Sequence, residues 1–381
     1  MRYFINPNSP SEGAPYTTPD TGAHKPSTLV TNVTLQVDDI VEVMDGTCTE
    51  TVNAGYPATG HWRPYYLNQN KPTFTSTTAT WLNFTGGSVS GMIFGPGDFF
   101  INYDGTTGFT IDGVSNHQAA IVFRCGSASS GPVRVVNCDG VLGGLVSSTS
   151  TSSVDLEIVN NSFFRFSDKC VNLNQATGSA KIVGNVLDGN NEGHGGYGIN
   201  ITNAIDSTCD YNTLRRCTPY SGTASGGPHD NSDDPLWVDA ANYNFSLSSG
   251  SPMIDIGVGT DSTIVAAPNH DKSWPRHPRP QGSGVDRGSY EYGRAAVNRF
   301  SDSSALSSTN ALTLIDSSAL VTAIQGAGTD TYFDQTTEIA SVAVRYTHQD
   351  GRQRKEILHS GSGLTGNASW TDGARDGTWQ K

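Results

Sequence analysis

The sequence predicts an all-β protein in which a solenoid of stacked parallel coils is followed by a small, β-sandwich-like domain. Short apolar runs that end at Gly, Asn or Asp recur about 23–28 residues apart, which is the spacing of a repeat architecture. The composition combines 43 glycines with only 15% charged residues, and this suits short strands joined by tight turns. The recurring segments are 109–114, 133–140, 156–163, 180–189 and 208–214.

Apolar residues recur at equivalent places in these segments, and stacked coils would bury them in a shared narrow core. The first expected inward stack consists of Ile111, Val135, Ile158 and Ile182. The expected stack from a second strand of each coil consists of Ile121, Leu145, Val171 and Ile199.

One polar column follows the first strand of the repeat. Cys138, Asn161, Asn185 and Asn212 occupy it in successive coils. The three asparagines predict a ladder of buried amides that hydrogen-bond from coil to coil. Three unrelated turns are the alternative interpretation.

The charge balance argues against some partners. A formal net charge of −13 argues against nucleic acid, which needs clustered Lys and Arg, and against an anionic membrane surface. No run approaches the roughly 20 apolar residues of a membrane-spanning helix. We therefore expect no nucleic-acid partner and no membrane span.

Residues 1–35 are expected to form an N-terminal entry segment or cap. The opening Met-Arg-Tyr-Phe-Ile lacks the apolar core of a secretion signal. We expect a chain made without such a signal, and a removed signal is the alternative. The six cysteines show no metal spacing, so we expect small apolar fillers, with disulfides between neighbouring coils as the alternative.

The most specific motif lies between residues 233 and 291. It contains Asp-Asp-Pro-Leu-Trp-Val-Asp, then Ser-Pro-Met-Ile-Asp-Ile-Gly, and finally Val-Asp-Arg-Gly-Ser-Tyr-Glu. This order closely resembles the C-terminal coils of right-handed parallel β-helix proteins in the pectate-lyase-like superfamily. The strand and Asp-Gly turn in 37–50 resemble the first turn of the same proteins. We interpret the closing motif as structural, with Pro and Gly setting turns and Asp accepting backbone N–H groups.

The resemblance covers about residues 1–293 and implies a right-handed parallel β-helix over 36–293. Residues 294–337 are expected to be a linker. Residues 338–381 contain an alternating apolar pattern and an Asp-Gly hairpin turn, which predict a small β domain. They amount to half a sandwich, so we expect the natural chain to continue past Lys381.

The resemblance also implies a sugar polymer as the ligand. The best candidate cluster is the glycine-rich stretch 188–197. Asp188, Glu192 and His194 are the candidate catalytic residues, because paired carboxylates can cleave a glycosidic bond and His is an acid or base at neutral pH. Tyr197 is a candidate sugar ligand. The alternative is a plain exposed loop.

A second acidic cluster predicts a calcium site built from Asp230, Asp233 and Asp234. A solvated turn is the alternative, and no cofactor is required by any other motif. A set that would suit a lyase base and its partners is Arg165, Asp168 and Lys169.

Three aromatic residues, Trp62, Tyr65 and Tyr66, lie in an irregular stretch. They are candidates for stacking on sugar rings. Covering the end of the solenoid is the alternative role.

Three classes of function fit these observations. The favoured one is a virion- or surface-associated protein, like a phage tail spike or fibre, that binds cell-surface polysaccharide and acts as a rigid, trimeric structural element. The second is a secreted polysaccharide lyase or glycoside hydrolase. The third is a subunit of an extracellular filament or adhesin. Each implies a virion or extracellular location.

Overall fold

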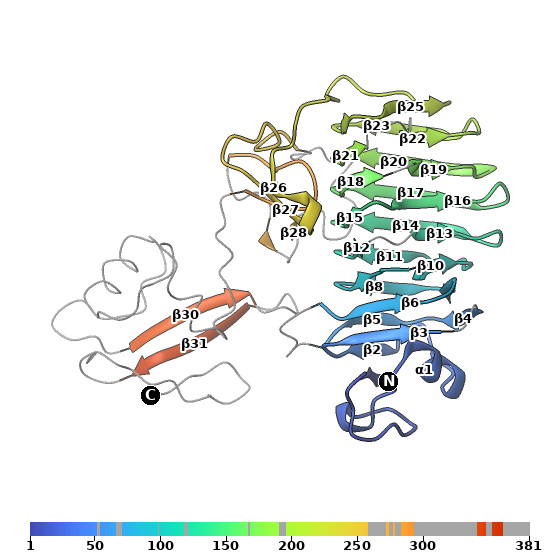
Figure 1. Ribbon diagram of the computed structural model, residues 1–381, viewed down its shortest axis with the longest axis vertical. Coiled ribbons are helices and arrows are strands. Elements are labelled where there is room, and N and C mark those ends of the chain that lie inside the picture. The colour runs from blue at the N-terminus through green and yellow to red at the C-terminus, as the bar shows by residue number, and fades with distance from the viewer. Residues whose placement is uncertain are drawn as a thin grey trace. The chain divides into compact units, whose positions relative to one another are not determined.

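The computed structural model describes residues 1–51, 54–65, 71–97, 99–117, 121–166, 168–189, 196–257, 272–273, 277–278, 283–292, 341–347 and 353–360. The chain divides into two compact units, Met1–Tyr292 and Gly293–Lys381. The first unit is a parallel β-helix, so the predicted all-β solenoid is confirmed (Figure 1). In the part of the chain that is described, no helix has the length and apolar character needed to cross a membrane.

Three parallel sheets, named A, B and C, form the β-helix. Sheet A contains β1 (Arg2–Ile5), β2 (Ile40–Val43), β5 (His61–Pro64), β8 (Gly87–Ser90), β11 (Phe109–Asp112), β14 (Ser130–Val136), β17 (Ser153–Val159), β20 (Thr177–Val183) and β23 (Asp206–Asp210). Sheet B contains β3 (Thr47–Glu50), β6 (Thr73–Ser76), β9 (Ile93–Phe94), β12 (Ser115–His117), β15 (Asp139–Val141), β18 (Ser162–Phe166), β21 (Val186–Gly189) and β24 (Thr213–Arg215). Sheet C contains β4 (Ala54–Ala58), β7 (Thr80–Phe84), β10 (Phe99–Tyr103), β13 (Ile121–Cys125), β16 (Gly144–Ser148), β19 (Lys169–Leu173), β22 (Tyr197–Ile201) and β25 (Thr218–Gly222).

The chain visits the sheets in the order A, B, C, and each coil lies directly on the one before (Figure 1). Eight stacked strands in sheets B and C correspond to about seven turns. Neighbouring strands in such a stack lie about 4.8 Å apart. The β-helix is therefore a short rod with flat outer faces and three corners.

The first inward stack is confirmed. Ile111, Val135, Ile158 and Ile182 pair in register along sheet A, and all four are fully buried.

The second predicted stack is wrong at its first two members. Ile121 pairs with Gly144 rather than with Leu145, and the buried stack in sheet C is Phe123, Val146, Val171 and Ile199. A shift of one residue exchanges the two faces of a strand. The adjacent apolar pair at 145–146 satisfies the pattern in either register, so the sequence cannot decide between them.

Each of the later coils turns from sheet A to sheet B through one residue in the left-handed backbone conformation. These residues are Gly113, Asn137, Asn160, Gly184 and Tyr211, with φ between 54° and 70°. Gly and Asn adopt this conformation at the least cost. The residue that follows in each coil is buried, which is why the polar column lies one position after the turn.

The predicted asparagine ladder is confirmed at this A–B corner. Asn161 donates from Nδ2 to Oδ1 of Asn185 at 2.8 Å, and Asn185 donates from Nδ2 to Oδ1 of Asn212 at 3.0 Å. The backbone N–H groups of Asn161 and Asn185 donate to the same oxygens. All three side chains are fully buried. Buried amides are stable only when their polar atoms find partners, so each coil requires the next one in register.

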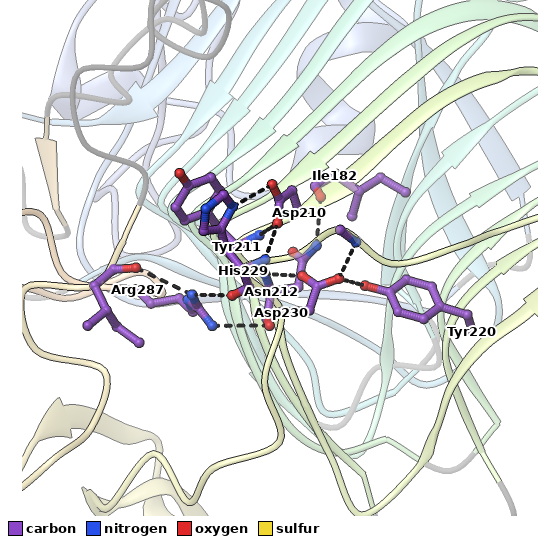
Figure 2. A network of polar contacts seen from close by, with 10 residues as sticks. Ile182, Asp210, Tyr211, Asn212, Tyr220, His229, Asp230 and Arg287 are labelled. Carbon is purple, nitrogen blue, oxygen red and sulfur yellow. Dashed lines mark hydrogen bonds and ion pairs between the residues drawn. The ribbon is translucent and has the colours of Figure 1, made fainter.

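Asp230 terminates the ladder, as Figure 2 shows. Its Oδ1 accepts the N–H of Asn212 at 2.7 Å, and its Oδ2 accepts the N–H of Gly227 at 2.8 Å and the hydroxyl of Tyr220 at 2.5 Å. Burial and the hydrogen bond to Asp230 raise the pKa of Tyr220, so its hydroxyl stays a donor. Asp230 thus takes the place that an asparagine of a further coil would occupy, because it accepts the N–H of Asn212. Asn231 then donates its own N–H to Asn212 O, as the next coil would.

The two ends of the rod are protected in different ways. At the N-terminal end, the 3-10 turn η1 (Pro19–Thr21) precedes α1 (Pro26–Asn32), which packs against β4. Buried Glu50 accepts hydrogen bonds from the N–H and hydroxyl of Ser27 at the start of α1. At the other end, Thr218 of β25 donates to Gly196, so the next residue, Pro219, faces the open strand edge without an N–H group. Proline at such an edge discourages pairing with another strand.

The closing motif is structural, as interpreted from the sequence. β26 (Trp237–Asp239), the 3-10 turn η2 (Ala240–Asn242) and β27 (Asn244–Leu247) form a short hairpin beside sheet B (Figure 1). The ring of Trp237 meets those of Phe164 and Phe245 edge to face, with centroids 6.0 Å and 5.1 Å away. This packing covers part of the outer face of sheet B.

Residues 286–292, here called the strap, then run along the A–B corner across four coils. Arg287 donates to Asn212 O at 3.1 Å, and Gly288 donates to Gly184 O at 2.9 Å. Ser289 donates its N–H to Ser162 Oγ at 3.0 Å, and the Tyr290 hydroxyl donates to Asp139 at 3.0 Å. Through these hydrogen bonds the strap connects the coil of Asn212 to the coil of Asp139, which lies more than 70 residues earlier in the sequence.

The remaining elements are short. All six cysteines are free, and five of them are buried. β28 (Lys272–Ser273) pairs with β29 (His277–Pro278). In the second unit, β30 (Ser341–Thr347) pairs antiparallel with β31 (Gln353–Ser360), where the sequence predicts a hairpin. The sandwich, the linker at 294–337 and the domain limits stay predictions.

We predict that Asn185→Leu lowers the free energy of unfolding by about 3 kcal/mol or more, because it leaves buried amide groups of two coils without partners. The exposed Asn242 provides the matched control, and Asn242→Leu should cost about 0.5 kcal/mol or less. Chemical denaturation followed by circular dichroism measures both. Equal effects of the two substitutions would show that the ladder does not hold the coils.

Candidate functional site

The corner between sheets B and C brings together the described residues with the most site-like chemistry. Asp188 in β21 lies in register between Phe164 of β18 and Arg215 of β24. Only 2% of its side chain is exposed. Its Oδ1 accepts Nε of Arg216 at 2.6 Å, while Oδ2 accepts an Nη of Arg216 at 2.8 Å and one of Arg215 at 3.1 Å. Two guanidinium groups are therefore held by one buried carboxylate.

The guanidinium groups reach the surface beyond Asp188. The side chains of Arg215 and Arg216 are 27% and 33% exposed, and Arg215 also pairs with Asp234 at 2.7 Å. Arg165 is exposed, and its guanidinium carbon lies 5.0 Å from the centre of the Phe164 ring. Arg216 approaches the same ring at 5.4 Å. The ring thus orders two cations through cation–π contacts.

The backbone at this corner is left-handed, as it is at the A–B corner. Leu142, Arg165 and Arg216 occur at equivalent places in their coils with φ of 70°, 59° and 49°. A non-glycine residue in this conformation costs about 1–2 kcal/mol. The turn between the sheets explains why these three residues are left-handed. It does not explain why two of them are arginines, so a functional reason for the arginines is worth testing.

A glycine-rich segment leaves the same corner between these two arginines. The chain departs at Gly189 and returns at Gly196, and Arg165 and Arg216 lie on the coils before and after it. The predicted catalytic residues Glu192 and His194 belong to this segment and lie outside the described residues. We call Asp188, Arg165, Arg215 and Arg216, together with the ring of Phe164, the arginine corner.

The arginine corner suits the binding of an anion. Planar guanidinium groups recognise carboxylate and phosphate through paired N–H donors. Asp188 acts as the buried anchor of two of them, because both of its oxygens accept guanidinium hydrogens. A carboxylate used in this way positions other groups rather than transferring a proton.

The predicted ligand-binding aromatics are separated by the structure. Tyr197 starts β22 and is partly exposed on sheet C, across the corner from Asp188. Trp62 is fully buried, and its indole N–H donates to Thr59 O at 2.9 Å. An indole without an exposed face cannot stack on a sugar, so the assignment of Trp62 is corrected to the core. Tyr65 packs edge to face on Phe4 near the N-terminal end, and Tyr66 lies outside the described residues.

The acidic cluster that predicts calcium does not fit a cation in this arrangement. Asp230 directs both oxygens at N–H and O–H donors of the ladder end. Asp234 accepts hydrogen bonds from Arg215 and from the N–H of Leu236, and Asp233 is exposed. Within the described residues, no group of three or more His, Cys, Asp or Glu side chains is placed to hold a metal ion.

A second group of titratable side chains lies under the end of the strap. Lys71 donates to Ser115 Oγ at 2.7 Å and to Gly113 O at 3.2 Å, while buried Asp139 accepts the Tyr290 hydroxyl. Burial lowers the pKa of Lys71 and raises the pKa values of Asp139 and Tyr290. Such shifts also mark active sites. Here the hydrogen bond between Tyr290 and Asp139 attaches the strap to the A–B corner. We therefore assign this group a structural role.

Sequence reasoning does not single out Arg215 and Arg216 as partners of Asp188. The available signal was the repeat itself, because aligning β21 with β24 places Arg215 directly above Asp188. The segment around Arg215 breaks the apolar pattern, so the last repeat ends at Leu214 in the sequence interpretation.

No family model and no curated protein matches the sequence. Among solved structures, the crystal structure of pectate lyase Pel9A is similar over 77% of this chain and 96% of its own, with 12% sequence identity and a TM-score of 0.29. The three continuous parallel sheets define the first unit, Met1–Tyr292, as a parallel β-helix.

We predict that His117 makes the protein less stable as the pH falls from about 6.5 to about 4. Burial, followed by the nearby charge of Lys71, lowers the pKa of His117 to about 4. Its folded-state pKa is below the unfolded value, so in this window the unfolded chain takes up the proton first and stability is lost. With solvent screening of a partly exposed ring, the loss should be about 1–2 kcal/mol.

The matched variant is His117→Phe, which keeps a ring stacked against Tyr243, whose centroid is 3.6 Å from that of His117. Unfolding curves measured across this pH range should be flatter for the variant. An unchanged slope would exclude His117 as the titrating group.

Proposed function

We propose that the protein is a rigid β-helical rod of the virion or cell exterior that binds an anionic surface polysaccharide at the arginine corner. The observation that carries the proposal is the pair of arginines held by Asp188, with Arg165 on the preceding coil at the same corner. These residues gather cationic groups at one corner of a chain whose net charge is −13.

The chemistry supports a sugar acid as the ligand. Guanidinium groups bind carboxylates through two parallel hydrogen bonds, and the partly buried ring of Phe164 next to Arg165 offers an apolar neighbour. The overall negative charge repels a polyanion only at long range, because the screening length is about 8 Å at physiological ionic strength. Local contacts at the corner therefore decide binding.

The scaffold supports a rod-like role. Three parallel sheets hold each coil to the next, and the asparagine ladder and the strap add hydrogen bonds among the coils between Asp139 and Asn212. A polysaccharide is itself a repeating polymer, and a rigid face with a short repeat can follow it without reordering. Assembly into a trimer stays a prediction.

Two observations bear on the other classes of function. The oxygens of Asp188 are engaged by arginines, which supports binding over proton transfer by that residue. Glu192 and His194 keep an enzymatic alternative open, namely a secreted polysaccharide lyase or glycoside hydrolase. The cap with α1 at one end of the rod and Pro219 on the edge strand at the other argue against a filament built by stacking β-helices end to end.

Arg165→Ala tests the proposal, because this side chain is exposed and its removal leaves the Asp188 ion pairs intact. We expect wild-type protein to bind oligogalacturonate or another oligosaccharide bearing carboxylates in calorimetry. The variant should bind about tenfold more weakly, which is the loss of one charge-assisted contact. Arg134→Ala is the charge-matched control on sheet A and should bind like the wild type.

Two results would contradict the proposal: no binding of any acidic oligosaccharide, or equal binding by Arg165→Ala and wild type. The same samples should be assayed for unsaturated and reducing ends. Release of such ends that His194→Ala abolishes would establish the enzymatic alternative instead.

A further inference from the structure

The outer face of sheet C carries two aromatic rings on consecutive coils. Trp81 in β7 pairs in register with Phe100 in β10, and their ring centroids are 5.5 Å apart with planes inclined by 14°. The next residues, Leu82 and Ile101, are buried in the core. Because successive side chains alternate between faces, Trp81 and Phe100 point outward, and both remain partly exposed.

A glycine on the adjacent coil accommodates the larger ring. Gly55 of β4 is the register partner of Trp81 on the other side from Phe100. A Cβ at this position would collide with the indole nitrogen of Trp81 and come within 2.5 Å of its Cε2. The indole therefore leans over Gly55, and the aromatic surface extends across three coils.

Two amides lie beside the rings at the next outward-facing places of the same strands. Asn102 donates from Nδ2 to Oδ1 of Asn83 at 2.8 Å and to Asp104 at 2.7 Å. Residues two positions apart on a strand are separated by about 6.6 Å, which is close to the width of a sugar ring. The face thus presents an apolar area next to the partly exposed amide of Asn83, which the buried Asn102 holds in place.

We propose that Trp81, Phe100, Asn83 and Asn102 form a platform for a neutral sugar ring of a glycan chain. The C–H groups on one face of a pyranose would lie on the aromatic surface, whose negative face attracts them. The hydroxyl groups at the edge of the sugar would reach the partly exposed amide of Asn83. Asn102 is only 7% exposed and uses its Nδ2 to hold Asn83 and Asp104, so it fixes the orientation of Asn83. The choice of a sugar rests on the glycan-binding function proposed above, but none of these residues belongs to the arginine corner.

The composition of the face favours a sugar over a second copy of the chain. A contact between proteins would bury apolar area broadly, whereas here two rings adjoin amides that are already hydrogen-bonded to each other. An aromatic ring beside hydrogen-bonding side chains matches the two chemical faces of one sugar ring. The platform is also rigid, because it is built on strands rather than on a loop.

The full chain is titrated with neutral hexasaccharides of glucose, mannose, xylose and N-acetylglucosamine, and calorimetry measures the binding. We expect at least one to bind, Trp81→Ala to weaken its binding at least tenfold, and Trp81→Phe to stay within about threefold of wild type. Tyr292→Ala removes an exposed aromatic side chain elsewhere and should bind like the wild type. Circular dichroism confirms that each variant is folded.

The platform is overturned if none of the four hexasaccharides binds, or if Trp81→Ala binds them as wild type does. It is also overturned if Trp81→Ala only abolishes a concentration-dependent increase in mass, since the rings would then be an interface between copies. Arg165→Ala separates the two proposals. Loss of acidic-glycan binding in Arg165→Ala, with no effect of Trp81→Ala on neutral sugars, would leave the proposed function standing without the platform.

Discussion

The rest of the structure depends on one constraint, namely that each coil pairs with the next in a fixed register. The buried amides of Asn161, Asn185 and Asn212 enforce this register. An amide in an apolar interior must hydrogen-bond or destabilise the fold, and these amides find most of their partners in the neighbouring coils. A slip by one residue would break the ladder and turn the isoleucine stack toward solvent. Asp230 and the strap complete the arrangement where the repeat stops.

This arrangement leaves the B–C corner available for the proposed binding site. The A–B corner is occupied by the ladder inside and by the strap outside, so insertions there would disturb both. At the B–C corner the chain varies from coil to coil, and it accommodates both the glycine-rich segment after Gly189 and the left-handed arginines Arg165 and Arg216. Sheet C adds a flat outer face at the opposite end of the rod, where Trp81 and Phe100 stack.

The scaffold could be predicted from the sequence because its determinants are local and repeated. The Asn column, the Ile111 stack and the closing motif each recur or match a pattern without reference to distant residues. The register of sheet C could not be predicted, since Leu145 and Val146 are equally apolar. The burial of Trp62 was missed because its surroundings look irregular in sequence, although Trp62 pairs in register with Val41 and Val89 in sheet A. The Asp188–Arg216 pair joins residues 28 positions apart, and only the stacking reveals it.

Hydrogen exchange measured by mass spectrometry, with and without an acidic oligosaccharide, tests most directly the claim that one corner is scaffold and the other binds. The account predicts that backbone amides of Asn161 and Asn185 exchange slowly in both states. It also predicts that the ligand slows exchange around Arg165, in 188–197 and around Arg216. Protection confined to the A–B corner or to the strap, with the B–C corner unchanged, would contradict it.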